Sequence, residues 1–501
     1  VAALSTDQVA AFSTSQVAAL TTSEAATLSA AQAKALTTAQ VQQLSTSNIE
    51  ALNLNSVKAM TSTQLQALST TQLNALQTED FANLNEAQIT GLTTDQVKAL
   101  TTSAVTSLTA DQVSKFTTAQ VAAVTSTNVG ALNSDQVAAL TTAQVGTLNT
   151  AQVKAIATSA VAAMSTAQVT AMSTTQVAAL TTGQMAALTA NEVKALSTSQ
   201  VQALGSTQVN ALTNANIAAM TTTQVASLTA GQVTGLSTAA AASLVTAQVQ
   251  ALSTSQVQAI STANVAAMSS TQLSALTTGQ VSALTTAQVV ALETSDVAAL
   301  STGQVAALTT AQVNVLETAD IAAMSTGQVA ALSTAQVQAL SNGNVTALST
   351  SQVQAMGTAQ VNALSTAQVV AMTTGQVASL TAAQVKGMST DQVKALENAD
   401  VQVLNATQIK ALTTAQVQAL ETTDVAGLNT TQLAALTADQ VSALTTAQVV
   451  SLTTTEVSNL SYDQVKALTT TQLQAVETAD VAVLNSDQVS SLSATQVQAF
   501  T

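Results

Sequence analysis

The chain of 501 residues contains no Cys, His, Pro or Trp, one Tyr and four Phe. Its ten cationic residues are all Lys, so Arg is absent as well. Without Cys or His, the sequence excludes a disulfide framework, a Cys/His zinc cluster and a thiol nucleophile. Without His, a general base near neutral pH would have to be a retuned carboxylate or Lys. We therefore predict that the protein is not an enzyme and carries no cofactor.

Charge and hydropathy narrow the class of protein further. Asp and Glu number 25 against ten Lys, which gives a net charge of −15. This balance argues against nucleic-acid binding, because that affinity rests on cationic contacts to phosphates. At 47% hydrophobic and 7% charged residues, the chain also differs from a charge-rich disordered segment. No uninterrupted apolar run approaches the roughly 20 residues that a membrane-spanning helix needs.

What the chain does have is an eight-residue repeat that never slips. Its length is 62 × 8 + 5 residues, and rows of eight counted from Val1 give the consensus V-x-A-L-[ST]-T-x-Q. Val1, Val97 and Val497 all occupy position 1 of this octad, and Leu4 and Leu300 occupy position 4. We predict one continuous array of about 62 repeats over residues 1–501, forming a segment of a longer chain.

The octad predicts a short helix that restarts in every repeat. A spacing of three places Val and Leu on one helical face, whereas eight residues advance an unbroken helix by about 800° and would wind that face around the axis. Ser or Thr at position 5 and Gln at position 8 form the capping box S/T-x-x-Q, as in Ser13 to Gln16. Phe12 and Val17 then flank the box as a hydrophobic staple. We expect helices of about six or seven residues.

Charged residues support these helix boundaries. Of the 25 acidic residues, 24 lie at positions 5 to 8, where the helix dipole favours anions, and Glu50 is the exception. Nine of the ten Lys lie at position 2, late in the helix, and Lys115 lies one position further on.

Rare residues suggest how the helices stack. Six of the seven Gly at position 7 differ by multiples of 24, among them Gly183, Gly231 and Gly375. We therefore predict an all-α solenoid of three helices, or 24 residues, per coil, with Val and Leu inside. A 16-residue coil of two helices and a β-solenoid are the alternative folds. The 24-residue spacing of the glycines could also result from duplication of 24- or 48-residue blocks in the gene, in which case it would have no structural meaning.

One set of acidic residues is a candidate calcium site. The octads that read E-T-x-D place Glu293 and Asp296 24 residues before Glu317 and Asp320. Stacking in 24-residue coils would bring these four carboxylates together, and oxygen-rich clusters suit Ca²⁺. The alternative, which we favour, is a capping variant in which the acids serve the helix N-terminus. No other metal or catalytic residue is predicted.

Runs such as ALTTAQVVAL at residues 283–292 and ALSTAQVQAL at 331–340 resemble the repeat regions of very large bacterial secreted or surface proteins, including adhesin-like ones. The resemblance implies an extracellular or cell-surface stalk, sheath or filament component. We therefore predict a structural protein that spans distance or builds fibres by lateral or end-to-end self-association. The alternative is a repetitive binding surface for ice, glycan or a protein partner, presented by ladders of Thr and Ser.

Overall fold

A computed structural model describes residues 1–500, and these residues form 62 short α-helices and no strand. The prediction of an all-α repeat protein is thus confirmed. In chain order, helix αk begins at residue 8k − 2, from Thr6 for α1 to Ala494 for α62, so there is one helix per octad.

The helices span four to six residues each. Most have six residues and run from position 6 of one octad to position 3 of the next, as in α12 (Thr94–Ala99). The four-residue helices are α5 (Thr38–Val41), α9 (Thr70–Leu73), α20 (Thr158–Val161), α60 (Thr478–Val481) and α62 (Ala494–Val497). The five-residue helices are α1–α3, α10, α17, α28–α30, α34, α36, α39, α41, α46, α49, α50, α53, α55–α57 and α61.

The expected length of about six or seven residues is thus met at its lower bound by most helices, and none reaches seven. The residues at positions 4 and 5 are both extended, as at Leu36 (φ −61°, ψ 136°) and Thr37 (φ −72°, ψ 160°). Two extended residues turn the chain between consecutive helices, which leaves at most six residues of each octad for the helix itself.

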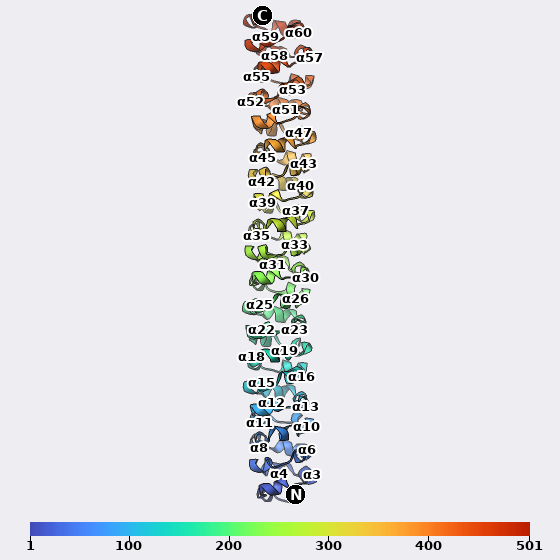
Figure 1. Ribbon diagram of the computed structural model, residues 1–501, viewed down its shortest axis with the longest axis vertical. Coiled ribbons are helices and arrows are strands. Elements are labelled where there is room, and N and C mark those ends of the chain that lie inside the picture. The colour runs from blue at the N-terminus through green and yellow to red at the C-terminus, as the bar shows by residue number, and fades with distance from the viewer. Residues whose placement is uncertain (501) are drawn as a thin grey trace. The chain divides into compact units, whose positions relative to one another are not determined.

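The chain divides into two compact units, residues 1–260 with α1–α32 and residues 261–501, whose described part carries α33–α62. Within each unit, the helices follow one another in stacked coils (Figure 1). The prediction of a single array over residues 1–501 stays a prediction.

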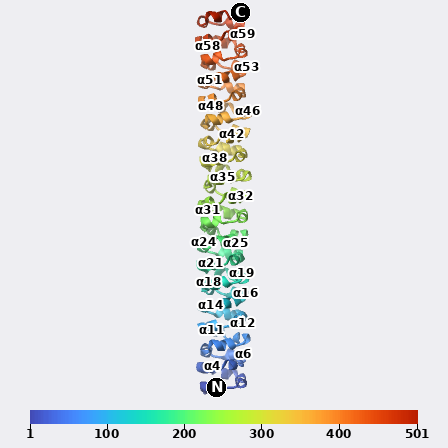
Figure 2. The same ribbon diagram turned by 90° about the vertical axis from the view of Figure 1, so that its left-hand side faces the viewer.

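In both units, each helix packs on the helix three places further along the chain. In the first unit α4 (Ala30–Ala35) packs on α7 (Leu54–Ala59), and in the second α37 (Thr294–Ala299) packs on α40 (Thr318–Ala323). One coil therefore contains three helices and three octads, as predicted, and the two-helix coil is wrong. Figure 2 gives a second view of these stacked coils.

The core of each unit is filled from positions 1 and 4. Val97 and Leu100 in the first unit, and Val305 and Leu308 in the second, are at most 5% exposed. Because a new helix starts in every octad, successive coils bury the same two positions, 1 and 4. Burial of these apolar side chains is the main contribution to the stability of the fold. Position 2 points outward and holds nine of the ten Lys.

Position 3 is small because the coils approach closely there. None of the described glycines has a positive φ, so backbone freedom does not explain them. A Cβ on Gly91 would lie 2.7 Å from Ser62 Cβ, and one on Gly235 would lie 2.6 Å from Ser206 Cβ. Close packing against the preceding coil therefore selects Gly at these two positions.

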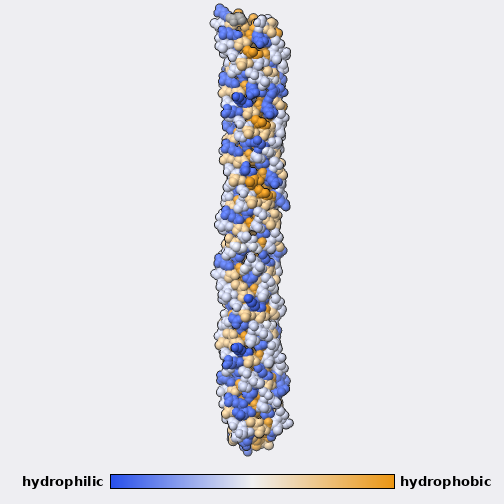
Figure 3. Space-filling model, in the orientation of Figure 1, coloured by the Kyte–Doolittle hydropathy of each residue, from blue (hydrophilic) through white to orange (hydrophobic). Residues whose placement is uncertain are grey.

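The visible face in Figure 3 mixes hydrophilic residues with hydrophobic ones, some of which form small strongly hydrophobic patches. Isolated valines at position 2 add to the apolar part, such as Val290 at 53% exposed and Val370 at 47%. Over residues 1–500, none of the helices combines the length and apolar character required to traverse a lipid bilayer.

Candidate functional site: the glutamine corner

The most regular polar structure in the protein is built around the Gln at position 8. At the start of α23 (Thr182–Ala187), the Thr181 hydroxyl accepts from the Gln184 N–H at 3.2 Å. The Thr181 N–H donates in return to Gln184 Oε1 at 2.8 Å. This is the predicted capping box, and it provides acceptors for two N–H groups that a helix start leaves without a partner.

The other end of the same amide bonds to the preceding coil. Gln184 Nε2 donates to the main-chain oxygens of Val153 at 2.8 Å, Ile156 at 2.7 Å and Lys154 at 3.5 Å. These carbonyls lie at the C-terminal end of α19 (Thr150–Ala155). One side chain thus caps the N-terminus of its own helix and bonds to carbonyls at the C-terminus of a helix four places earlier, of which Val153 O also accepts from the Ile156 N–H at 3.2 Å.

We call this arrangement the glutamine corner: the position-5 cap, the position-8 Gln and the carbonyls of the coil beneath. It recurs in the second unit, where Gln440 Oε1 accepts from the Thr437 N–H at 2.8 Å and Nε2 donates to Leu412 O at 2.7 Å. Gln184 and Gln440 are only 1% and 2% exposed. Sequence reasoning found the cap but missed the bond between coils, because its acceptors belong to a distant octad.

Shorter side chains at position 8 keep one of the two functions. Asn128 and Asn216 donate to the carbonyls of Leu100 and Leu188 in the coil beneath, both at 2.8 Å, without closing a capping box. Asp296 does the reverse, and its Oδ2 accepts from the Glu293 N–H at 2.9 Å. A carboxylate has no N–H, so an Asp corner lacks the donor toward the carbonyls below.

The outer oxygens of two Asp find another partner. Asp296 Oδ1 accepts from the Ser270 hydroxyl at 2.7 Å, and Asp320 Oδ1 from the Thr294 hydroxyl at 2.9 Å. Both hydroxyls are at position 6 in the preceding coil. Glu192, at 2% exposed, has no such donor: its Oε2 accepts from the Thr189 N–H, and its Oε1 is buried without a hydrogen-bond partner.

Two corners without any polar residue at position 8 are bridged from below. Ala104 and Ala240 stand where Gln is expected, and an Asn occupies position 2 of an earlier octad in each case. Asn210 Nδ2 donates to Gly235 O at 2.7 Å, and its Oδ1 accepts from the Ser237 N–H at 2.8 Å. Asn74 bonds to Ala99 and Thr101 in the same way. An amide from the preceding coil therefore takes over at these two corners, whereas at a third Ala at position 8, Ala160, the helix start has no side-chain cap.

Burial changes the acidity of several Asp at position 8. The pKa values of Asp80, Asp400, Asp424 and Asp480 lie above the ordinary value, chiefly because burial disfavours the charged form. In Asp400 and Asp424 the cap N–H acts in the opposite direction on the pKa, and the neighbouring cap Glu adds a smaller upward effect.

The candidate calcium residues are divided between the interior and the surface. Asp296 and Asp320 are 3% and 5% exposed and hold cap amides, whereas Glu293 and Glu317 are exposed and make no side-chain cap bond. Over residues 1–500, no group of three or more His, Cys, Asp or Glu is placed to hold a metal ion. The Asp side chains thus act as in the capping variant, and the calcium alternative stays a prediction.

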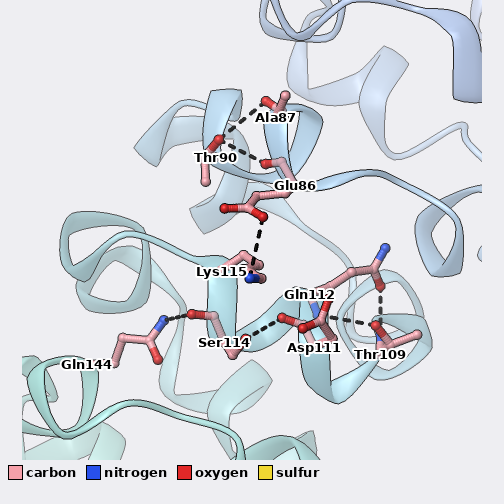
Figure 4. Close-up of polar contacts among 9 residues, drawn as sticks. All are labelled: Glu86, Ala87, Thr90, Thr109, Asp111, Gln112, Ser114, Lys115 and Gln144. Atoms are coloured by element: carbon pink, nitrogen blue, oxygen red, sulfur yellow. Dashed lines mark hydrogen bonds and ion pairs between the residues drawn. The ribbon is translucent and has the colours of Figure 1, made fainter.

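Figure 4 shows the ion pair of the described chain, which joins successive coils. Lys115 Nζ in α14 (Ala110–Lys115) lies 3.4 Å from Glu86 Oε2 in α11 (Glu86–Gly91). The same view shows Gln144 Nε2 donating to Ser114 O at 3.1 Å. Because Glu86 is 66% exposed, the pair contributes at most about 1 kcal/mol.

Position-6 threonines, the residues of the predicted ladders, include some whose methyl groups lie close to the next coil. A Cβ on Gly183 would lie 3.4 Å from Thr158 Cγ2, and one on Gly327 would lie 3.7 Å from Thr302 Cγ2. These methyl groups therefore take part in coil-to-coil packing. A binding surface for ice, glycan or protein stays a prediction.

The described hollows are of two kinds. An enclosed apolar void of about 20 Å³ lies between Phe116, Val124 and Leu148 in the first unit. An open surface groove of about 540 Å³ in the second unit is lined by Lys386, Lys410 and Asp439, among others.

Tandem short helices, a three-helix coil and recurring corners define the class of this protein as a helical repeat solenoid. The family model of the ALTTAQ repeat matches eleven segments that together cover more than half of the sequence, and the chain belongs to that family. The matched residues are 73–110, 113–150, 147–182, 177–214, 256–286, 289–316, 313–350, 343–374, 367–398, 393–428 and 417–454. No curated protein matches the chain.

Proposed function

We propose that this chain is a structural protein and not an enzyme, and that its coils act as a stalk, spacer or filament subunit. The observation that carries the proposal is the glutamine corner. The position-5 hydroxyls and position-8 amides of these corners bond to helix ends within the fold, as at Thr181 and Gln184. Groups used in this way hold coils together and are not free to act on a substrate.

The repeat explains how such a protein would span distance. Each coil contacts only its neighbours through the same corner bonds and the same Val and Leu positions, so coils can be added without redesigning the interface. The number of octads then sets the extent of the stack, which is the property that a spacer needs.

We place the protein outside the cell or at its surface, in agreement with its resemblance to repeats of large bacterial secreted and surface proteins. The absence of Cys is compatible with that location. We also propose that copies associate laterally or end to end, since the surface carries little charge: 7% of all residues are charged.

Deletion of whole octads tests the structural proposal. A variant lacking residues 289–336 loses six octads, or two coils, and should keep its helical circular dichroism per residue while small-angle scattering reports a shorter particle. A matched variant lacking residues 289–332 breaks the octad register and should lose protection against hydrogen exchange around the junction. Equal behaviour of the two variants, or a particle whose maximum dimension ignores the in-register deletion, would refute the proposal.

A further inference from the structure

Helix α20 (Thr158–Val161) is one of the shortest helices of the first unit, and its start is not held by a side chain. Over residues 1–260, it is the one helix that begins with neither a side-chain cap bond nor a capping box. Its cap residue is Ala157 and its position-8 residue is Ala160, so the hydroxyl and the amide of a glutamine corner are both missing.

The bridge that replaces Gln at other corners is missing here as well. At the two bridged corners, an Asn accepts from the cap N–H 27 residues later, as Asn210 does from Ser237. The equivalent residue for Ala157 is Gly130, which has no side chain. A Cβ on Gly130 would lie 3.0 Å from Ala155 O, so the two coils approach closely at this point. Within residues 1–260, no side chain takes over at the start of α20.

The carbonyls at the end of α20 lack a side-chain donor too. A position-8 Gln donates to carbonyls 31 and 28 residues earlier, as Gln184 does at 2.8 and 2.7 Å. The residue that would do this for Val161 O and Met164 O is Glu192, at position 8 in α24 (Ala190–Ala195). A carboxylate has no N–H to donate, and no other side chain of residues 1–260 bonds to these two carbonyls.

Glu192 adopts the same arrangement at its cap as a position-8 Gln. Its Oε2 accepts from the Thr189 N–H, and its N–H donates to Thr189 Oγ1 at 3.4 Å, so the capping box is closed. The side chain is 2% exposed, and Oε1 is the one buried side-chain oxygen of residues 1–500 without a hydrogen-bond partner. Because Glu and Gln have the same length and shape, Oε1 takes the place of the Gln Nε2 and faces acceptors, which is unfavourable.

We propose that α20 is a hinge built into the first unit: residues 157–164 detach locally while α17 (Ser134–Ala138) and α23, the helices on which α20 packs, keep their own corner bonds. One end of α20 has no cap, and the other end meets an oxygen where a donor is needed. Opening here therefore breaks fewer hydrogen bonds than opening at a complete glutamine corner. This inference concerns a motion of the coils and does not depend on the proposed function.

The hinge is confined to one side of its coil, because the neighbouring corners are complete. Gln152 in the preceding helix α19 and Gln168 in the following helix α21 (Thr166–Ala171) donate to carbonyls of the coil beneath, with shortest bonds of 2.7 Å. Both helices stay joined to that coil when α20 opens. Such an opening changes the angle between two coils and does not separate them.

Hydrogen exchange of the full chain at pH 7, read by mass spectrometry, tests the hinge in the wild type. Residues 181–188, one coil further on, begin at a complete corner and serve as the internal reference. After correction for intrinsic rates, residues 157–164 should exchange about tenfold to thirtyfold faster than this reference, the size expected for the loss of two hydrogen bonds. Exchange of the two stretches within twofold of each other would overturn the proposal.

The variant E192Q supplies the missing donor. Gln200, one octad later, shows its reach, because Nε2 donates to Val169 O at 3.1 Å and Met172 O at 2.7 Å. E192Q should slow exchange of residues 157–164 by about thirtyfold, since it adds two hydrogen bonds. The control E50Q removes the same charge from an exposed residue of the same unit and should leave these rates within twofold of wild type. Equal rates in E192Q and E50Q would refute the hinge.

The variant A157S supplies a cap at the other end of α20. Ser237 shows that a hydroxyl can cap a helix with Ala at position 8, since its Oγ accepts from the Ala240 N–H at 3.2 Å. A157S should slow exchange of residues 157–164 by about fivefold, the effect of one hydrogen bond. The control A162S adds the same hydroxyl at an exposed residue of the same turn and should change the rates by less than twofold. If A157S slows exchange no more than A162S does, the missing cap does not loosen α20 and the proposal fails.

Discussion

Replacing a glutamine at a fully formed corner tests the interpretation of the fold most directly. Gln184→Ala removes three short hydrogen bonds, one from the Thr181 N–H and two to the carbonyls of Val153 and Ile156, together with the 3.5 Å contact to Lys154 O. At about 1 kcal/mol net for each bond, we expect local stability to fall by about 3 kcal/mol. The loss should be local because each coil depends only on its neighbours.

Two further substitutions at the same residue separate the two ends of the amide. Gln184→Glu keeps the acceptor for the Thr181 N–H but loses both donors, so it should cost about 2 kcal/mol. Gln184→Asn should keep one of the two bonds between coils, as Asn216 does with Leu188 O, and lose the other and the cap, so it should also cost about 2 kcal/mol. Both substitutions should therefore destabilise less than Gln184→Ala, and they should do so through different bonds.

Hydrogen exchange of peptides within residues 150–190 measures these effects. Gln184→Ala should speed exchange there by about two orders of magnitude and leave distant peptides unchanged. Gln202→Ala is the matched control, because Gln202 is an exposed position-2 residue in the same unit. If Gln184→Ala and Gln202→Ala exchange within twofold of each other, the corner does not hold the coils and the reasoning fails.

Three other predictions follow from single features. Val124→Leu should fill the void of about 20 Å³ and raise stability in urea by about 0.5 kcal/mol, whereas a loss would show that the site is already fully packed. Asn210→Ala should cost about 2 kcal/mol by removing the bonds to Gly235 O and the Ser237 N–H. Asn314→Ala, at an exposed position-2 residue, is its control. If hydrogen exchange speeds up equally around the mutated site in both variants, the bridge formed by Asn210 does not stabilise the corner. Since burial raises the pKa of Asp80, Asp80→Asn should stabilise more at pH 7 than at pH 3.5, and an equal effect at both pH values in urea titrations would count against it.

Much of the fold could be read from the sequence because its signals are local. The capping box connects positions three apart, and the Val and Leu positions have the same separation. Ser13 to Gln16 therefore indicates a helix start without knowledge of any distant contact, and the structure places both bonds of that box where predicted. The recurrence of Gly183 and Gly231 at a multiple of three octads likewise predicted the coil.

The candidate site was less accessible. The capping box uses Oε1 of Gln184 as an acceptor and assigns no partner to Nε2. The one signal in the sequence was that a Gln amide also carries a donor, which would need an acceptor when buried. The sequence does show that Ala240 replaces the consensus Gln and that an Asn, Asn210, lies in an earlier octad. These two observations could not be connected before the coil was known, because the two residues are separated by more than one whole coil.

The amino-acid sequence by itself determined where each helix starts, which residues face inward and how many octads form a coil, because these depend on neighbouring residues and on a period. Tertiary structure alone decided that the glutamines join coils, that the outer oxygen of Glu192 is buried without a partner, and that Gly91 and Gly235 lie where two coils nearly touch. Those features depend on the height of one coil above the next, and no short-range pattern encodes that height.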